Sequence, residues 1–190
     1  GFVEAVLLGI IEGLTEFLPV SSTGHLILAS HLLNLKQTDF LKSFEIAIQT
    51  GAILSVVVLY GRKLLSEKLL LKQTMIAFVP TGIIGFLIYK LVKTYLLGNF
   101  MVTVLALIIG GVGIIAAEIY FRKEKQTIEI KDLSVTKTLM LGVIQSISMI
   151  PGVSRSAATI IGGLFLGLNR KAAVEFSFIL AIPTMTAATG

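Results

Sequence analysis

Long apolar runs separated by short polar stretches dominate the pattern of this chain. Three of the runs, at residues 40–60, 68–89 and 98–121, are each long enough to cross a bilayer as a helix. At about 1.5 Å per residue, roughly 20 helical residues cover a hydrocarbon core about 30 Å thick. A further run starts near Lys171 and continues to the end of the chain. All of these runs predict membrane-spanning helices.

Two other apolar stretches are shorter, and a proline interrupts each of them. Each stretch consists of two segments around its proline: 2–17 and 22–33 around Pro19, and 136–150 and 154–167 around Pro151-Gly152. As helices, the first two segments reach only about 24 Å and 18 Å, which is too short to span the core. Irregular backbone at membrane depth has to be buried in protein. Each stretch therefore predicts a re-entrant helical hairpin.

An internal repeat relates the two predicted hairpins. Gly9-Ile10-Ile11-Glu12 matches Gly142-Val143-Ile144-Gln145, and Val20-Ser21 matches Val153-Ser154 at the same offset of 133 residues. An odd number of full spans separates the copies, so the repeats are expected to be inverted. Inverted repeats bring broken helices together near the bilayer midplane.

The fold class predicted from these patterns is an all-α, polytopic membrane protein with inverted repeats that each contain a re-entrant hairpin. Residues 1–190 form a single domain, with repeat one at about 1–90 and repeat two at about 98–190. Because the chain starts at Gly1 without Met and ends inside an apolar run, we expect repeat two to be truncated.

Composition agrees with membrane embedding and narrows the function. The 190 residues are 55% hydrophobic and 14% charged, whereas soluble domains average about 45–50% apolar and about 25% charged residues. The chain has no cysteine, which excludes disulfides and thiolate chemistry. A net charge of +5 carried by loop Lys and Arg residues fits membrane topology and predicts no nucleic-acid partner.

The basic loops predict an orientation in the membrane. Two loops hold most of the positive charge: Arg62, Lys63, Lys68 and Lys72 in one, and Arg122, Lys123, Lys125, Lys131 and Lys137 in the other. Short loops rich in Lys and Arg face the cytoplasm. The first hairpin is then expected to enter from the external side and the second hairpin from the cytoplasm.

The tip of the first hairpin gathers groups that are costly inside a membrane. Glu12 and Glu16 are four residues apart, so they share one face of a helix. Ser21-Ser22-Thr23 after Pro19 is a helix start signal, and a helix N-terminus favours an anion such as phosphate. Ionisable groups at membrane depth are functional by default.

The tip of the second hairpin adds a cation. Ser154 is an expected N-cap, which places Arg155 in the first helical turn, where the helix dipole disfavours positive charge. A bidentate phosphate contact would explain an Arg at this position. An ion pair with Glu12 or Glu16 that only holds the hairpins together would also explain it.

The two tips resemble a known family. Glu12-Gly13-Leu14-Thr15-Glu16-Phe17-Leu18-Pro19-Val20-Ser21-Ser22-Thr23-Gly24-His25 and Pro151-Gly152-Val153-Ser154-Arg155-Ser156 are similar to the motifs of the undecaprenyl-diphosphate phosphatase family, which is linked to bacitracin resistance. Segments 44–49 and 175–178 also resemble the family pattern. The resemblance implies hydrolysis of undecaprenyl diphosphate to the monophosphate. It places the reaction at the external side of a bacterial plasma membrane, where it recycles the carrier lipid for cell-wall synthesis.

Site roles follow from the resemblance combined with side-chain chemistry. The expected catalytic residues are Glu12, Glu16, Ser22, His25 and Arg155, and the expected substrate-binding residues are Ser21, Thr23, Ser154, Ser156, Thr159, Gln49 and Glu175. Ser22 is the candidate nucleophile, with His25 as its base or proton shuttle. Ser22 is alternatively a plain helix cap and His25 the nucleophile. Glu12 and Glu16 either activate this pair or hold a divalent cation, Mg²⁺ or Ca²⁺, on the phosphates.

Other polar residues are open to structural explanations. The i,i+4 pair Glu118 and Arg122 is expected to be structural. Lys171 and Glu175 have the same spacing, which allows a local ion pair in addition to the site role that the resemblance implies for Glu175. Glu45 and Gln49 share a helix face, where they line the pocket or join helices by hydrogen bonds.

Two rival functions have to be weighed. A secondary transporter or flippase for a phosphorylated lipid or anion would also use inverted repeats with broken helices. The type-2 phosphatidic-acid phosphatases need a His shortly after Ser-Arg, and residues 156–168 contain none, so this family is rejected. The partners expected are a polyprenyl diphosphate, the membrane and, as a possibility left open, a second copy in a homodimer.

Overall fold

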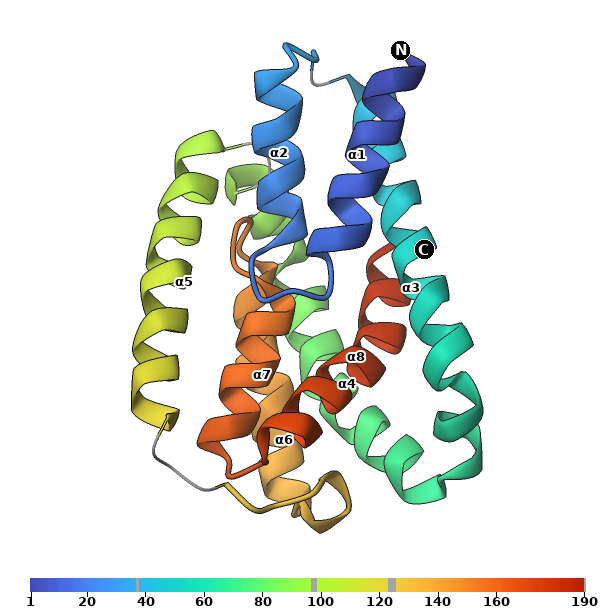
Figure 1. Cartoon of the computed structure of the whole chain (residues 1–190), viewed down its shortest axis with the longest axis vertical. Helices are drawn as coiled ribbons and strands as arrows, with labels where there is room; N and C mark the ends of the chain where they lie inside the picture. The colour runs from blue at the N-terminus through green and yellow to red at the C-terminus, as the bar shows by residue number, and fades with distance from the viewer. Residues whose placement is uncertain (37, 97–98, 123–125, 190) are drawn as a thin grey trace.

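Helices make up almost all of the regular structure in the computed structural model, which describes residues 1–36, 38–96, 99–122 and 126–189 (Figure 1). In chain order the elements are α1 (Phe2–Thr15), α2 (Ser22–Leu32), α3 (Asp39–Ser66), α4 (Lys68–Leu91), the π-helical turn η1 (Val92–Leu96), α5 (Phe100–Phe121), the 3₁₀ turn η2 (Ile130–Asp132), α6 (Val135–Gln145), the 3₁₀ turn η3 (Ser146–Met149), α7 (Arg155–Phe165) and α8 (Arg170–Thr189). The described ranges contain no strand beyond an isolated bridge between Ile128 and Leu168. The all-α prediction is confirmed.

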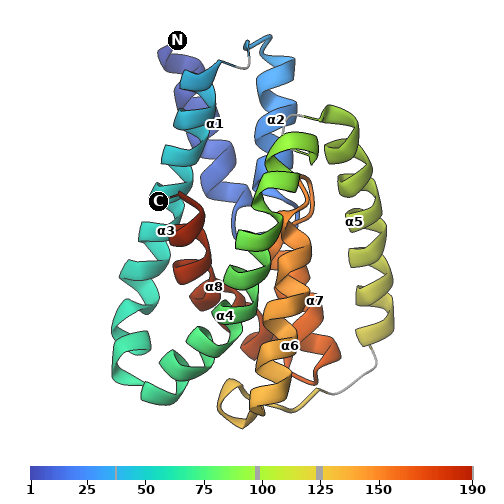
Figure 2. The ribbon, with the colours of Figure 1, turned by 180° about the vertical axis from the view of Figure 1, so that it is seen from behind.

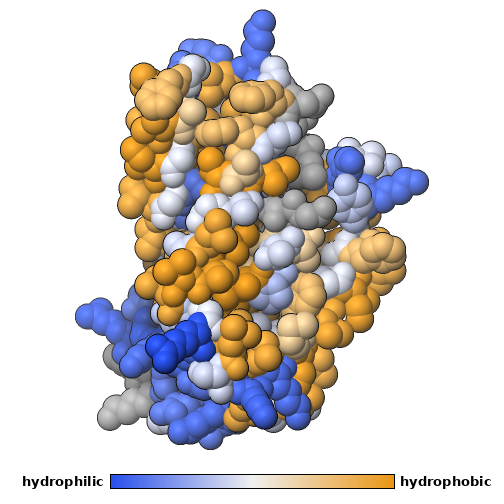
Figure 3. All heavy atoms as spheres, turned by 90° about the vertical axis from the view of Figure 1, so that its right-hand side faces the viewer, coloured by the Kyte–Doolittle hydropathy of each residue, from blue (hydrophilic) through white to orange (hydrophobic). Residues whose placement is uncertain are grey.

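Four helices of the described chain are long and apolar enough to cross a membrane: Ser43–Ser66, Lys68–Leu96, Phe100–Phe121 and Arg170–Ala188. They correspond to the predicted spans, so the protein is a multi-pass membrane protein. Helix α3 continues to Ser66, beyond the predicted end at residue 60, because its last turns carry basic residues past the apolar segment. In Figure 3, hydrophobic side chains cover much of the face shown, and hydrophilic side chains gather at its lower end.

The two short helix pairs form hairpins that point toward each other. Helices α1 and α2 lie side by side in the upper half of the molecule, and α6 and α7 in the lower half (Figures 1 and 2). Their connections meet at mid-height, where the Ser156 hydroxyl of the second tip donates a hydrogen bond to the Leu18 carbonyl of the first (2.7 Å). The contact between the tips that the sequence predicts is therefore present.

Serine caps start the second helix of each hairpin. The Ser21 hydroxyl accepts from the Gly24 N–H (3.3 Å), and the Ser154 hydroxyl accepts from the Ala157 N–H (3.1 Å). Ser21 has φ +62°, a left-handed conformation that costs a non-glycine residue of order 1–3 kcal/mol. The matching caps occupy the positions that the 133-residue offset relates. The division into inverted repeats stays a prediction.

Helix α8 lies at the centre of the packing. Phe176, Ile179 and Leu180 on α8 are fully buried, and this helix packs on α3, α4 and α7. The second hairpin is anchored mainly by α6, which packs closely on α4. The core therefore positions the second hairpin tip through α4 and α8.

Gly142 permits the close approach of α6 to α4, and replacing it with Ala is expected to destabilise the fold. A Cβ at this position would lie 2.0 Å from the Ala77 carbonyl oxygen and 2.6 Å from the Pro80 ring. Overpacking typically costs about 1–3 kcal/mol, and we expect the upper end because backbone has to shift. Thermal melting in detergent measures the effect, with Gly110→Ala as the control because a Cβ there meets nothing within 4 Å. Equal melting temperatures for both variants would contradict the prediction.

Candidate active site

The Glu16 carboxylate is the centre of the polar cluster at the first tip. Glu12 and Glu16 lie one helical turn apart at the end of α1, and both are buried inside the protein. The Ser22 hydroxyl, at the first position of α2, donates a hydrogen bond of 2.5 Å to Glu16 Oε2. Because α1 ends before Pro19 and α2 starts after it, the turn carries Ser22 back to the acidic face of α1.

Arg155 links the second tip to the first. It is the first residue of α7, and its Nη2 donates to Glu16 Oε1 at 2.8 Å. The same guanidinium is held by α8, since Nη1 donates to the Ser177 carbonyl (3.0 Å) and Nη2 contacts Met185 Sδ (3.4 Å). One carboxylate thus contacts both the candidate nucleophile and the candidate phosphate-binding cation.

His25 lies on α2 one turn after Ser21 and is half-buried. Its Nδ1 lies 2.8 Å from the Ser21 carbonyl oxygen. A carbonyl only accepts, so Nδ1 carries the proton and Nε2 is left for other partners. The Ser22 hydroxyl is hydrogen-bonded to Glu16 and not to His25.

Glu12 has an unusual environment for a carboxylate. Both of its oxygens are buried without a hydrogen-bond partner in the described chain. Glu16, Ser22 and Glu45 are polar neighbours of this carboxylate. Glu45 itself accepts a hydrogen bond of 3.0 Å from Ser30 on α2. Unpaired buried carboxylates are costly, so this arrangement suits a cation or proton that arrives from elsewhere.

Glu12 and Glu16 are the candidate ligands for a divalent cation. In the part of the chain that the structure describes, no three or more His, Cys, Asp or Glu side chains form a cluster that could hold a metal. Mg²⁺ is nevertheless commonly bound by one or two carboxylates, with substrate phosphates and water completing its shell. The orphaned oxygens of Glu12 next to Glu16 fit that donor set.

The remaining hydroxyls of the second tip are engaged with one another, with Ser177 and with backbone carbonyls. Ser154 and Ser156 contact each other at 3.0 Å, and Thr159 contacts the Ser177 hydroxyl of α8 at 2.6 Å. Thr23 is exposed on the first turn of α2. The structure therefore gathers the serines of the second tip beside Arg155, with their hydroxyls partly occupied.

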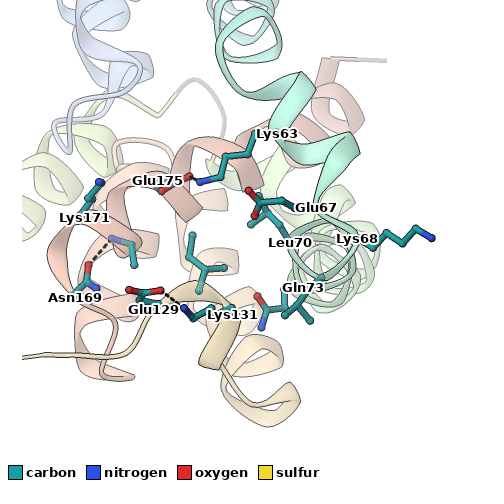
Figure 4. A pocket seen from close by; sticks show the side chains of 13 residues that line it. Lys63, Glu67, Lys68, Leu70, Gln73, Glu129, Lys131, Asn169, Lys171 and Glu175 are labelled. Atoms are coloured by element: carbon teal, nitrogen blue, oxygen red, sulfur yellow. Dashed lines mark hydrogen bonds and ion pairs between the residues drawn. The ribbon is translucent and has the colours of Figure 1, made fainter.

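One of the predicted substrate-binding residues has its printed contacts outside this cluster, and another, Gln49, is half-buried on α3. Glu175 forms an ion pair with Lys63 of α3, not with Lys171 one turn away, and lines a separate charged hollow of about 470 Å³ (Figure 4). In the same hollow the hydrogen bond from Lys131 keeps the pKa of Glu129 below its usual value.

The expected pair within α5 is also replaced by a pair between helices. Glu118 is hydrogen-bonded to Arg170 of α8 instead of Arg122.

Replacing Glu175 with Gln is expected to leave turnover within about twofold of wild type. The pair with Lys63 is partly exposed, and such pairs contribute about 0–1 kcal/mol. The measurement is phosphate release from a polyprenyl diphosphate, with Glu129→Gln in the same hollow as the matched control. A tenfold loss confined to Glu175→Gln would return this residue to the active site.

Sequence reasoning named Glu175 on α8 but missed the residues of α8 that contact the second tip. The Ser177 carbonyl, the Ser177 hydroxyl and the Met185 sulfur all contact the second tip. A backbone carbonyl has no sequence signature, and the only signal available was the resemblance of residues 175–178 to a family pattern. The contact of the Leu18 carbonyl with Ser156 was equally invisible in the sequence.

The fold and the site together define a class: a polytopic helical membrane protein with a buried carboxylate, hydroxyl and guanidinium cluster where two hairpin tips meet. The family model described as "Bacitracin resistance protein BacA" matches residues 5–190. The chain belongs to the bacitracin resistance protein BacA family.

Curated relatives agree with this membership, and each of the following is named undecaprenyl-diphosphatase. The chain is 58% identical to the protein of Aquifex aeolicus over 98% of its own length and 73% of the relative. It is 58% identical to the Persephonella marina protein over 100% of its length and 74% of the relative. The Thermus thermophilus protein is 53% identical over 98% of the chain and 72% of the relative.

Proposed function

We propose that this protein is an integral membrane hydrolase that cleaves undecaprenyl diphosphate into undecaprenyl phosphate and phosphate. The observation that carries the proposal is the Glu16 carboxylate, which joins the Ser22 hydroxyl of one tip to the Arg155 guanidinium of the other. Membership of the BacA family and relatives named undecaprenyl-diphosphatase support the same chemistry. The reaction recycles the carrier lipid for peptidoglycan synthesis and confers resistance to bacitracin.

Substrate binding uses the positive groups of the two tips. Arg155 offers a planar fork that fits two phosphate oxygens, and its Nε has no partner in the described chain. The first N–H groups of α2 and α7 add a partial positive charge on either side. Because the diphosphate competes with Glu16 for the guanidinium, binding releases Glu16 from part of its ion pair.

The release of Glu16 prepares the nucleophile. Ser22 Oγ attacks the terminal phosphorus and forms an O–P bond, while the bond from that phosphorus to the bridging oxygen breaks. The hydroxyl proton passes to Glu16 Oε2, which already accepts it as a hydrogen bond. Undecaprenyl phosphate leaves with the bridging oxygen, and its charge is stabilised by Arg155.

A second step returns the enzyme to its starting state. Water attacks the phosphorus of the phosphoserine, one of its protons is taken by the free Nε2 of His25, and the Ser22–phosphorus bond breaks. The proton held by Glu16 returns to Ser22, His25 gives its added proton to the departing phosphate, and inorganic phosphate leaves. The hydrogen bond from Nδ1 to the Ser21 carbonyl keeps Nε2 as the accepting nitrogen throughout.

We assign a divalent cation, Mg²⁺ or Ca²⁺, to Glu12 and Glu16. When bound, such an ion neutralises the charge that accumulates on the phosphate oxygens. The unpartnered oxygens of Glu12 support this assignment, since a buried carboxylate beside a second carboxylate needs a positive partner.

We place the reaction at the external side of the bacterial plasma membrane. The argument is the basic loops, which the positive-inside rule assigns to the cytoplasm and which leave the first hairpin open to the outside. Accessibility of a cysteine introduced at Thr23 to a membrane-impermeant reagent tests this side. A homodimer is a further prediction, which light scattering in detergent tests.

Phosphate release from undecaprenyl diphosphate by the purified protein in detergent tests the proposed function. Hydrolysis is expected without any membrane gradient, which a secondary transporter or flippase would not perform. A chelator is expected to lower the rate by at least tenfold, and Mg²⁺ or Ca²⁺ to restore it. Absence of hydrolysis by a folded, monodisperse sample would reject the phosphatase, and hydrolysis unaffected by chelator would reject the cation alone.

A further inference from the structure

An apolar groove of about 290 Å³ lies beneath the tip of the first hairpin. Each surrounding helix contributes a stripe at helical spacing: Ile114 and Ala117 from α5, Ile160 and Leu164 from α7, and Val174 and Phe178 from α8. These stripes face one another between α5, α7 and α8, so the groove is a feature of three packed helices. The family comparison and the catalytic cluster assign no role to it.

One end of the groove is lined by residues that adjoin the catalytic cluster. Phe17, Leu18 and Pro19 line it, and they directly follow Glu16 in the chain. The Leu18 carbonyl holds Ser156 of the second tip. On the opposite wall, Phe178 packs edge-on against Phe17 with ring centroids 5.3 Å apart and directly follows Ser177, whose carbonyl holds Arg155.

The other end of the groove is lined by two charged side chains. Glu118 of α5 and Arg170 of α8 line the groove there and form a bidentate ion pair, with N–O distances of 2.7 and 3.1 Å. The groove is therefore apolar between a phosphate-binding cluster and a surface ion pair. A ligand that fits this order of environments has a phosphate at one end and a single hydrocarbon chain.

We propose that the groove binds the first isoprene units of the substrate, so that the chain runs from the diphosphate at Arg155 toward the Glu118–Arg170 pair. The proposal rests on the proposed function, because that function supplies the prenyl diphosphate. Ligand pockets range from roughly 300 to 1,000 Å³, so a groove of this size holds only the beginning of a long chain. The charged end then turns the remainder of the chain out into the bilayer.

Narrowing the groove tests the proposal through chain-length dependence. Ile114→Trp fills the groove from α5, and Val174→Phe fills it from α8. The matched control is Ile115→Trp, because Ile115 is 62% exposed on the outer face of α5 and does not line the groove. The substrates are isopentenyl, farnesyl and undecaprenyl diphosphate. Both groove variants are expected to raise KM for the farnesyl substrate by on the order of tenfold, because apolar chain contacts are lost. The KM for isopentenyl diphosphate, whose single isoprene unit reaches only the near end of the groove, is expected to change by less than twofold.

Two results would overturn the groove proposal while leaving the phosphatase intact. One is an equal KM for the groove variants and Ile115→Trp on the farnesyl substrate. The other is an equal loss on the isopentenyl and farnesyl substrates, which would mean that the substitutions disturb the catalytic cluster. If the wild type hydrolyses none of the diphosphates, the proposed function fails by a separate observation.

Photocrosslinking identifies the molecule that binds in the groove without a measurement of turnover. A farnesyl diphosphate with a diazirine at its distal end is expected to label α5 around Ile114 and Ala117 in the wild type. Labelling is expected to be suppressed by undecaprenyl diphosphate, by Ile114→Trp and by Val174→Phe. Equal suppression by phosphatidylglycerol would make the groove a general lipid site and overturn the proposal, as would labelling confined to other helices.

Discussion

Replacing Ser22 with Ala is expected to lower phosphate release by roughly a thousandfold or more at saturating substrate. Ser22 is buried at the start of α2, and its hydroxyl is already hydrogen-bonded to the carboxylate that would take its proton. The adjacent Ser21 hydroxyl does not replace it, because it caps the helix and faces the Gly24 N–H. Stability should fall by only about 1–3 kcal/mol, the usual range for losing a hydrogen bond to a charged group.

The control for Ser22→Ala is Ser55→Ala, which removes an exposed hydroxyl bonded only to a backbone carbonyl within α3. It is expected to keep full turnover. Mass spectrometry of acid-quenched wild-type enzyme should also detect a phosphoserine at position 22. More than a tenth of wild-type turnover in a folded Ser22→Ala variant would exclude Ser22 as nucleophile and leave His25 or water in that role.

Replacing Arg155 with Lys is expected to lower turnover by roughly 30- to 1,000-fold, or about 2–4 kcal/mol of transition-state stabilisation. Lys retains the positive charge that pairs with Glu16 but lacks the planar fork that holds two phosphate oxygens. It also cannot reach the Ser177 carbonyl and Glu16 with separate nitrogens, as Arg155 does. Turnover at saturating substrate is the quantity to compare.

Arg62→Lys is the control for Arg155→Lys, because Arg62 is an exposed arginine near the end of α3 and lines neither the polar cluster nor the groove. Its effect on turnover should be small. Near-normal turnover of a well-folded Arg155→Lys variant would show that neutralising Glu16 is the whole role of this residue, and would remove it from the catalytic residues.

The sequence predicts most of the fold because membrane embedding leaves few alternatives. A span needs a long apolar run, and a broken run such as residues 136–150 and 154–167 has to be buried in protein. The caps Ser21 and Ser154 are predictable for the same local reason, since their hydroxyls serve backbone groups three residues away. Patterns within one helix therefore transfer directly to the structure.

Contacts between helices are less accessible to this reasoning. The sequence leaves the partner of Arg155 open between Glu12 and Glu16, and the structure assigns Glu16. Glu118 pairs across helices with Arg170, although Arg122 has the spacing for a pair within α5. Such choices depend on how helices distant in sequence approach each other. Local spacing carries no information about that approach.

The hydrogen bonds that join the two hairpin tips also have a consequence for biogenesis. Glu16 and Arg155 are 139 residues apart in the chain, as Leu18 and Ser156 are 138 apart. At a synthesis rate of about 5–20 residues per second, the ribosome takes roughly 7–28 s to make the second tip after the first. Throughout that interval the carboxylates of α1 have no guanidinium partner. We therefore expect the first hairpin to complete its insertion only after the second has been synthesised, and a nascent chain arrested before Arg155 to be recognised by membrane quality-control proteases.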